Sequence, residues 1–293
     1  MTILITGASG FLGANLAHDL AQTYSVIGTY RNEYPPVPGV DWVSMDLTCR
    51  DSVRQVVENC CPTVAVHCAA QANTERAQTH FDEAVQINRD GTCLLVESLP
   101  RDCYLIHIST EHVYNASKSW FLETDPPGPV NQYGRTKLLA EQEVLHFEGD
   151  WIILRMALLY GGRKEYRLCF SDRIYSQMKQ GKPVSLFMDE FRTPLNMSDV
   201  AIAVQAAMER HPAREIFNLG GPDRLSRAEF GAILAEETGL DPGLIQRISV
   251  DSSPTIAPRP RDLSLNSDKI RSCLGIHPLS VREGIRRAYS TCP

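Results

Sequence analysis

The chain has 293 residues, of which 43% are hydrophobic and 22% are charged, and its formal net charge is -6 at pH 7. These values are ordinary for a globular enzyme or binding protein, and the length suits one large domain or a core with a smaller lobe. Lysine and arginine form no cluster, which excludes a basic nucleic-acid-binding surface. No stretch is long and apolar enough to span a bilayer. We therefore expect neither a nucleic-acid nor a membrane partner.

The cysteines and the first residues indicate the compartment. Nine cysteines occur, at positions 49, 60, 61, 68, 93, 103, 169, 273 and 292. Their number is odd and they show no CxxC spacing, so neither a zinc site nor a redox dithiol is supported and no metal is predicted. The opening letters MTILITG read as a strand rather than as a signal peptide. The expected location is a reducing cytoplasm.

Short apolar runs alternate with helical patterns up to residue 161. Strands are predicted over 2–6, 24–30, 42–45, 63–70, 103–110 and 151–161, and helices over 7–22, 49–60, 81–99 and from 133 onward. Because strands that alternate with helices favour parallel pairing, the pattern predicts an α/β fold. We expect a doubly wound parallel sheet of the Rossmann type.

The rhythm changes after Gly162. A loop and a helix are predicted over 191–210, one more sheet strand over 215–221 and a helix over 226–239, followed by a Pro- and Arg-rich loop. We therefore predict a Rossmann core from 1–161 and 193–220. The smaller, discontinuous substrate lobe would comprise 162–192 and 221–293.

A glycine-rich loop, GASGFLG, joins the first predicted strand to the first helix. Gly7, Gly10 and Gly13 allow a tight turn and a close approach of backbone to a ligand. A helix N-terminus offers free N–H groups to a pyrophosphate. We interpret the loop, including Ser9, Phe11 and Leu12, as a dinucleotide site. The alternative is a tight turn with a purely structural role.

The end of the second predicted strand bears on the choice of cofactor. The letters GTYRN place Arg31 where NADP would carry its 2′-phosphate, whereas NAD usually meets a carboxylate there. NADP(H) is therefore favoured over NAD(H), although a solvated loop arginine would look the same. In the letters MDL, Asp46 and Leu47 would lie at the adenine, although a solvent-facing strand-end aspartate fits equally well.

The letters YGRTK place Tyr133 and Lys137 four residues apart. On a helix, this spacing puts both side chains on one face. A free tyrosine, with a pKa of about 10, is a poor acid or base at neutral pH, and a nearby cation lowers that pKa. The pair predicts a tuned acid/base, while the five letters alone also fit the surface of an amphipathic helix.

Taken together, these motifs resemble the extended short-chain dehydrogenase/reductase family. The shared features are GASGFLG, HCAA at the end of the fourth long strand, IST at the end of the fifth, YGRTK and ILRMALLYG. Within the family, the order of HCAAQANTERAQ, INRDGT, ISTEHVYN, YGRTKLLAE and RPRDLSLNSDK is similar to the dTDP-4-dehydrorhamnose reductase branch. The resemblance covers nearly the whole chain and is loosest from Gly162 to Thr255.

The resemblance implies roles for individual residues. Tyr133 would be the general acid that protonates a carbonyl oxygen, and Lys137 would bind the nicotinamide ribose and lower the tyrosine pKa. Thr110 would hydrogen-bond the same oxygen. Ala69 and Ala70, in HCAA, would line the cofactor site. The implied reaction is reduction of the keto group of a nucleotide-linked deoxysugar by NADPH.

The chain departs from the branch after Thr110, where Glu111 and His112 replace an Asp-Tyr pair. They could act as an acid and a base, as the acidic pair of related sugar dehydratases does. Alternatively, Glu111 holds substrate hydroxyls or the loop, and His112 only packs. Arg259 and Arg261 could hold an anionic substrate group such as a diphosphate, or they could form salt bridges in a solvated loop.

Two classes of function follow from the resemblance. The first is an enzyme, either the keto-sugar reductase or a related nucleotide-sugar epimerase or dehydratase. The second is an NADP-binding regulator, because the β subunit of methionine adenosyltransferase is similar to the same branch. The intact Thr110, Tyr133 and Lys137 favour the enzyme. The oligomeric state stays open, with a homodimer as one option.

Overall fold

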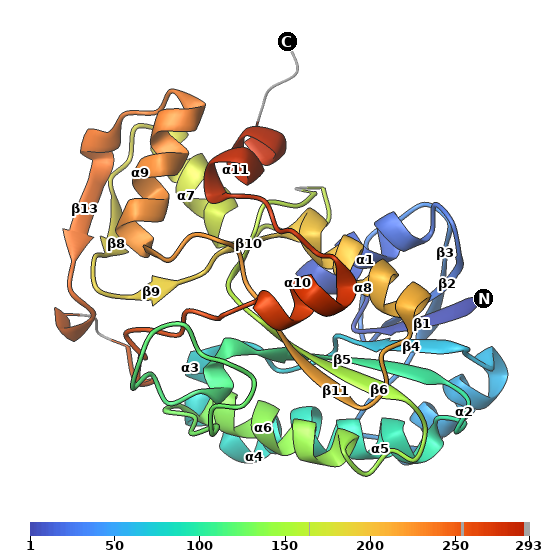
Figure 1. The fold of residues 1–293 in the computed structure, drawn as a ribbon. Coiled ribbons are helices and arrows are strands. Elements are labelled where there is room, and N and C mark those ends of the chain that lie inside the picture. The colour runs from blue at the N-terminus through green and yellow to red at the C-terminus, as the bar shows by residue number, and fades with distance from the viewer. Residues whose placement is uncertain (164, 253–254, 290–293) are drawn as a thin grey trace.

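The computed structural model describes residues 1–163, 165–252 and 255–289. Its centre is a seven-stranded parallel sheet with the order β11-β6-β5-β4-β1-β2-β3 (Figure 1). The strands are β1 (Thr2–Thr6), β2 (Ser25–Tyr30), β3 (Val40–Ser44), β4 (Val64–His67), β5 (Tyr104–Thr110), β6 (Trp151–Met156) and β11 (Glu215–Leu219). The strand order reverses between β1 and β4, which is where ligands bind in such sheets. The predicted doubly wound fold is confirmed.

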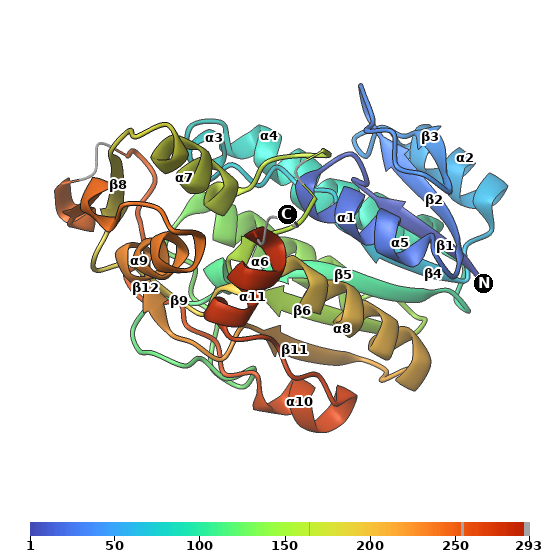
Figure 2. The ribbon, with the colours of Figure 1, turned by 90° about the horizontal axis from the view of Figure 1, so that it is seen from above.

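Helices cover both faces of the sheet, as Figures 1 and 2 show. One face packs against α1 (Phe11–Leu20), α8 (Met197–Arg210) and α10 (Asp268–Leu274), and the other against α2 (Arg50–Cys60), α5 (Gly91–Ser98) and α6 (Gln132–Val144). The central strands are buried along their whole length, with β4, β5 and β6 showing no exposed position. Their continuous apolar runs follow from this burial on both faces.

The helix predicted over 81–99 is not continuous. The structure has α3 (Thr74–Thr79), α4 (Phe81–Val85), a π-helical turn η1 (Gln86–Asp90) and then α5. Inside this turn, the buried Asn88 donates to Thr136 Oγ1 at 2.8 Å, while Thr92 donates to the Asn88 carbonyl at 2.6 Å. We attribute the π turn to these bonds, of which the one to Thr136 ties the helix to α6.

The smaller lobe is built from α-helices and short strand pairs. Its elements are α7 (Phe170–Lys179), α9 (Arg227–Thr238) and α11 (Val281–Tyr289), with the pairs β8 (Val184–Phe187) with β13 (Ile245–Ile248) and β9 (Phe191–Arg192) with β12 (Leu225–Ser226). A further pair, β7 (Leu159–Tyr160) with β10 (Leu195–Asn196), leads the chain back to α8. Short 3-10 turns are η2 (Glu111–Val113), η3 (Pro242–Leu244) and η4 (Val250–Ser252). A capping box of Ser226 and Glu229 begins α9.

One segment of the predicted lobe packs on the core instead. The prediction places 221–293 in the smaller lobe, but Ile270, Leu274 and Ile276 belong to the apolar cluster of the large sheet. Helix α10 lies against β11 and α8 (Figure 2). Cys292 lies outside the described residues, and the other eight cysteines are free. In the described part of the chain, no helix has the length and apolarity needed to cross a membrane.

Candidate active site

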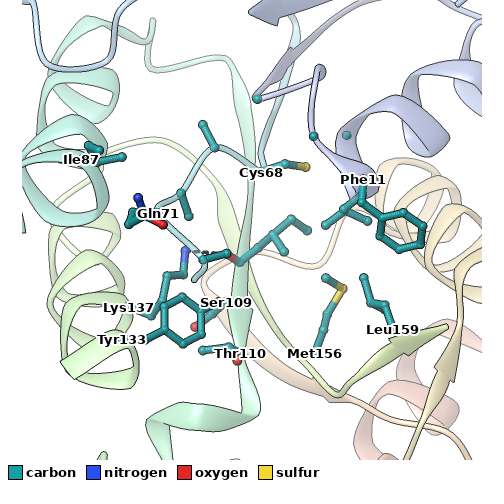
Figure 3. A pocket seen from close by; sticks show the side chains of 18 of the residues that line it. Phe11, Cys68, Gln71, Ile87, Ser109, Thr110, Tyr133, Lys137, Met156 and Leu159 are labelled. Carbon is teal, nitrogen blue, oxygen red and sulfur yellow. Dashed lines mark hydrogen bonds between the residues drawn. The ribbon is translucent and has the colours of Figure 1, made fainter. Parts of the chain in front are cut away.

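A cavity of about 660 Å³ opens at the carboxyl edge of the sheet, where the strand order reverses. It gathers residues that the sequence predicts from separate motifs along the chain, and Figure 3 shows several of their side chains facing it. The predicted residues that line it are Gly7, Ser9, Gly10, Phe11, Leu12, Gly13, Arg31, Asp46, Leu47, Ala69, Ala70, Thr110, Glu111, His112, Tyr133 and Lys137. Arg259 and Arg261 are not among the lining residues.

The glycine loop leaves room for a ligand at the start of α1. A Cβ on Gly13 would lie 2.4 Å from the Gly7 carbonyl oxygen, so Gly13 is needed for packing within the loop. A Cβ on Gly10 would meet only that oxygen, at 3.2 Å, because its other side faces the cavity. Gly10 is the N-cap of α1 and supplies no side-chain cap, so the helix end can present N–H groups to a phosphate. The loop therefore fits a dinucleotide.

Arg31 and Asp46 lie together in the cavity, just beyond the ends of β2 and β3. Arg31 Nη2 is 3.5 Å from Asp46 Oδ2, and the two side chains are 61% and 38% exposed. The Thr48 amide and hydroxyl both donate to Asp46 Oδ1, and these bonds lower the pKa of the carboxyl. Exposed ion pairs are weak, about 0–1 kcal/mol, so Arg31 can exchange its partner for a phosphate at little cost.

Tyr133 lies in the first turn of α6, and Lys137 lies one turn further on, so the predicted helical pairing is present. The Tyr133 and Thr110 side chains lie next to each other (Figure 3), within reach of a hydrogen bond that lowers the tyrosine pKa. Burial raises the pKa of Tyr133 to about 12, against the opposing effect of the Thr110 bond, and the Glu111 carboxylate raises it further. The lowered tyrosine pKa that the sequence suggests is therefore not found in this structure.

The Lys137 ammonium explains why that effect is missing. Its Nζ donates to the Ile108 carbonyl at 2.7 Å and lies 3.2 Å from His107 Nε2, so these two bonds are directed at β5 rather than at the phenol. Lys137 is only 3% exposed. Burial lowers its pKa to about 8, against the opposing effect of Glu141 and Cys68. The amine still lines the cavity beside Tyr133.

Glu111 is a buried carboxylate at the substrate end of the cavity. Arg192 Nε lies 2.9 Å from Glu111 Oε1, as an ion pair whose alignment is too poor for a hydrogen bond. Glu111 Oε2 has no hydrogen-bond partner among the described residues. Burial raises the pKa of Glu111 to about 7, although Arg192 and Arg227 lower it. Glu111 therefore titrates near neutral pH.

His112 packs against Tyr133, with ring centroids 5.6 Å apart and an interplanar angle of 68°. Burial and the charge of Arg192 lower its pKa to about 3, so the ring is neutral. Asn131, the N-cap of α6, accepts a bond from the Gly134 amide at 2.9 Å, and its Nδ2 lies 3.1 Å from His112 Nδ1. A Cβ on Gly134 would lie 2.0 Å from the His112 carbonyl oxygen, so YGRTK requires its glycine.

The two arginines of the late loop are held by acidic partners. Arg259 Nη1 lies 3.4 Å from Glu190 Oε2, and Arg261 bonds to Asp189 and Asp251 at 2.5 and 2.6 Å. Glu190 is itself buried between Arg192, Arg227 and Arg259. In this structure Arg259 and Arg261 therefore form salt bridges, as one of the two alternatives expected. Their role in substrate binding stays a prediction.

The cavity is also lined by residues that the sequence did not mark as site residues. Ser109 lies beside Thr110 and donates to Glu141 Oε1 at 2.5 Å. Leu158 and Leu159, which follow β6, and Phe170, which begins α7, form an apolar wall of the cavity. Cys68 and Gln71 flank the predicted alanines. Most of them lie within or next to the motifs HCAA, IST and ILRMALLYG, at the carboxyl ends of β4, β5 and β6, and this is the signal that could have found them.

Three curated relatives are similar over nearly the whole chain. A probable low-salt glycan biosynthesis reductase, Agl14, from Haloferax volcanii is 27% identical over 94% of this chain and 93% of its own. The dTDP-4-dehydrorhamnose reductase of Aggregatibacter actinomycetemcomitans is 27% identical over 98% and 99%. The β subunit of methionine adenosyltransferase 2 from Bos taurus is also 27% identical, over 94% and 82%.

Solved structures share the fold. A hypothetical dTDP-4-dehydrorhamnose reductase from Sulfolobus tokodaii superposes with a TM-score of 0.84 at 29% identity, over 97% of this chain and 99% of its own. MoeE5 in complex with UDP-glucose and NAD superposes with a TM-score of 0.83 at 26% identity, over 98% and 97%.

The match to a protein-family model agrees with the site and with these relatives. Residues 1–292 match the RmlD substrate binding domain. The predicted type of enzyme, an NAD(P)-dependent short-chain dehydrogenase/reductase, is confirmed at the level of the family. The chain belongs to the RmlD substrate binding domain family of extended short-chain dehydrogenases/reductases.

Proposed function

We propose that the protein is an NADP(H)-dependent reductase of the keto group of a nucleotide-linked deoxysugar. The observation that carries the proposal is the hydrogen-bonded pair of Tyr133 and Thr110, beside Lys137, in a cavity whose far end holds the glycine loop and Arg31. This arrangement provides a proton donor at one end and a dinucleotide cradle at the other. The reductases among the relatives support the substrate class.

NADPH, held by the glycine loop and Arg31, would supply the hydride for the carbonyl carbon and thereby become NADP⁺. The electron pair of the C=O bond passes to the oxygen, which takes the proton of the Tyr133 hydroxyl and becomes an alcohol. Thr110 bonds to the same oxygen and orients it. At neutral pH a tyrosine whose pKa is about 12 is fully protonated and ready to donate. The phenolate left on Tyr133 regains a proton from solvent, while Lys137, which lines the cavity beside it, would bind the nicotinamide ribose.

The surroundings of Glu111 and His112 favour reduction over dehydration. A dehydratase needs an acid and a base at these positions, but His112, whose pKa is lowered to about 3, is a weak base and cannot hold a proton at neutral pH. Glu111 is paired with Arg192. We propose that the free Oε2 of Glu111 accepts a bond from a sugar hydroxyl instead. Arg259 and Arg261 remain candidates for the diphosphate, and such a group would have to compete with Glu190 and Asp189.

A second candidate is an NADP-binding regulatory subunit, which the similarity to the methionine adenosyltransferase β subunit favours. The test is to incubate the protein with NADPH and a panel of nucleotide 4-keto sugars, while following the loss of NADPH absorbance and the product mass. A reductase consumes NADPH and adds two hydrogens to one sugar. A regulator binds NADPH and leaves every sugar of the panel unchanged.

A further inference from the structure

Two histidines lie side by side beneath the cavity. His67 on β4 and His107 on β5 face each other in the register of the sheet, and their ring centroids are 5.2 Å apart. Both are at most 1% exposed. Neither belongs to the proposed proton donors or to the cofactor cradle, so their burial in the centre of an apolar sheet calls for an explanation.

His67 has partners for both of its ring nitrogens. Its Nδ1 lies 2.6 Å from Thr6 Oγ1 and its Nε2 lies 2.9 Å from Thr92 Oγ1. Because the Thr92 hydroxyl gives its proton to the Asn88 carbonyl, it can only accept from His67. His67 therefore donates through Nε2 and accepts through Nδ1, and it has no lone pair left for another residue.

His107 is arranged differently. Its Nε2 lies 3.2 Å from Lys137 Nζ. A lysine ammonium only donates, so Nε2 accepts and the ring proton sits on Nδ1. His107 Nδ1 is buried and has no hydrogen-bond partner within the described part of the chain. A buried, unpaired N–H group is costly, so the chain keeps this histidine in spite of a cost that an apolar residue would avoid.

We propose that His107 is a positioning residue that holds the Lys137 ammonium for cofactor binding, an inference that rests on the proposed function. The ammonium has three N–H groups. Ile108 and His107 accept two of them, which leaves the third for a ligand in the cavity that Lys137 lines. The two acceptors lie on adjacent residues of β5, so the sheet fixes the direction in which the remaining N–H group points.

The charge of Lys137 agrees with this role. Burial lowers its pKa to about 8, and Glu141 and Cys68 oppose that effect. His107 is neutral, since burial and the charge of Lys137 hold its pKa well below the usual value. A neutral acceptor can bind the ammonium without competing with a proton of its own. Removing the acceptor would therefore both free the side chain and favour the uncharged amine.

The test compares His107→Leu with His107→Gln, and uses Ile153→Val as the control. Ile153 lies opposite His107 on β6. Its side chain has no polar atom, so it cannot accept a hydrogen bond from Lys137. NADPH affinity is measured by titration, and the thermal midpoint is measured for each variant. We expect His107→Leu to weaken NADPH binding roughly tenfold to a hundredfold, as for the loss of a bond to a charged group. The thermal midpoint shows that each variant is folded at the temperature of the titration.

His107→Gln keeps an acceptor and should restore most of the affinity, and Ile153→Val should bind NADPH like the parent. Parent-like affinity in His107→Leu overturns the proposal. So does equally weak binding in His107→Gln and His107→Leu, because it points to shape rather than to the acceptor. These measurements need no turnover. If the parent binds NADPH and reduces none of the keto sugars, the proposed function fails while the His107 series still gives its own result.

Discussion

Tyr133 offers the most direct test at the scale of a single residue. Tyr133→Phe removes only the hydroxyl that bonds to Thr110, so the fold and NADPH affinity should be retained. Turnover should fall by about 10²–10⁴-fold, the usual contribution of a positioned acid or base. The measurement is steady-state reduction of an accepted keto-sugar nucleotide, alongside an NADPH titration.

Tyr24→Phe is the matched control, because Tyr24 packs against the core and does not line the cavity. It should reduce the substrate like the parent. If Tyr133→Phe also reduces the substrate at the parental rate, Tyr133 is not the proton donor.

Glu111 should make stability depend on pH. Its pKa is raised from 4.5 to about 7 in the folded chain, so the folded state binds more protons than the unfolded state between these values. Stability should therefore fall as pH rises through this window. The free energy of unfolding of the parent, relative to Glu111→Gln, should drop by about 2–3 kcal/mol between pH 5 and pH 8. Urea unfolding at both pH values measures it, and a difference that does not change with pH contradicts the raised pKa.

Arg31 should set the choice between NADPH and NADH. Losing a charge-assisted bond to the 2′-phosphate should weaken NADPH about tenfold or more, equivalent to roughly 1.5–3 kcal/mol. Arg31→Ala should therefore lose NADPH affinity and leave NADH nearly untouched. Arg54→Ala, an exposed arginine on α2, controls for the change in net charge. Equal weakening of both cofactors by Arg31→Ala would mean that Arg31 does not read the phosphate.

At the scale of elements, the N-terminus of α1 should determine cofactor binding. Gly10→Val would place a branched side chain on the side of the loop that faces the cavity. Gly10 has φ of -82°, which valine can adopt, so the fold should survive. We expect NADPH binding to be lost in a folded variant, as measured by calorimetry and circular dichroism. Unchanged affinity would leave the loop with a structural role only.

The regular elements could be predicted because their periodicity is local. The strands β1, β4 and β5, the helix α6 and the late strand β11 all occur where the apolar patterns predict them. The π turn η1 could not be predicted, because it depends on a bond between Asn88 and Thr136 across 48 residues. The run 151–161 likewise divides into β6 and β7, because the chain leaves the sheet at Ala157 to pair with β10.

The candidate site was predictable in its composition but not in its electrostatics. Motif spacing brings Thr110, Tyr133 and Lys137 to one cavity. The direction of the Lys137 ammonium depends on His107, which no motif marks. The predicted shift of the Tyr133 pKa was therefore wrong in direction. Burial and distant charges set such shifts, and neither can be read from spacing alone.

At the scale of the whole molecule, Arg192 joins the two parts of the chain. It is 2% exposed, lies between Glu111 and Glu190, and donates to the carbonyls of Phe191 and Pro260. Arg192→Met should lower the free energy of unfolding by about 3–5 kcal/mol, because it leaves a buried carboxylate without its partner. Urea denaturation measures the loss.

The double variant Arg192→Met/Glu111→Gln should recover part of that loss, since it also removes the unpaired charge. If the double variant is no more stable than Arg192→Met, Arg192 stabilises the fold through its bonds to the Phe191 and Pro260 carbonyls and not through Glu111. The pairing of Arg192 with Glu111 joins positions 81 apart in sequence, so the motifs could not have predicted it.

The return of α10 to the large sheet has a consequence for engineering. The chain enters the small lobe after β6, comes back through α8 and β11, leaves again, and returns once more at Ile270 before α11 closes the lobe. The lobe is therefore not one continuous segment that could be exchanged at two junctions. Exchanging it with that of a relative, in order to graft a new sugar preference, would require matched junctions at every crossing. Single substitutions around Glu111 and Phe170 offer the more practical route to altered specificity.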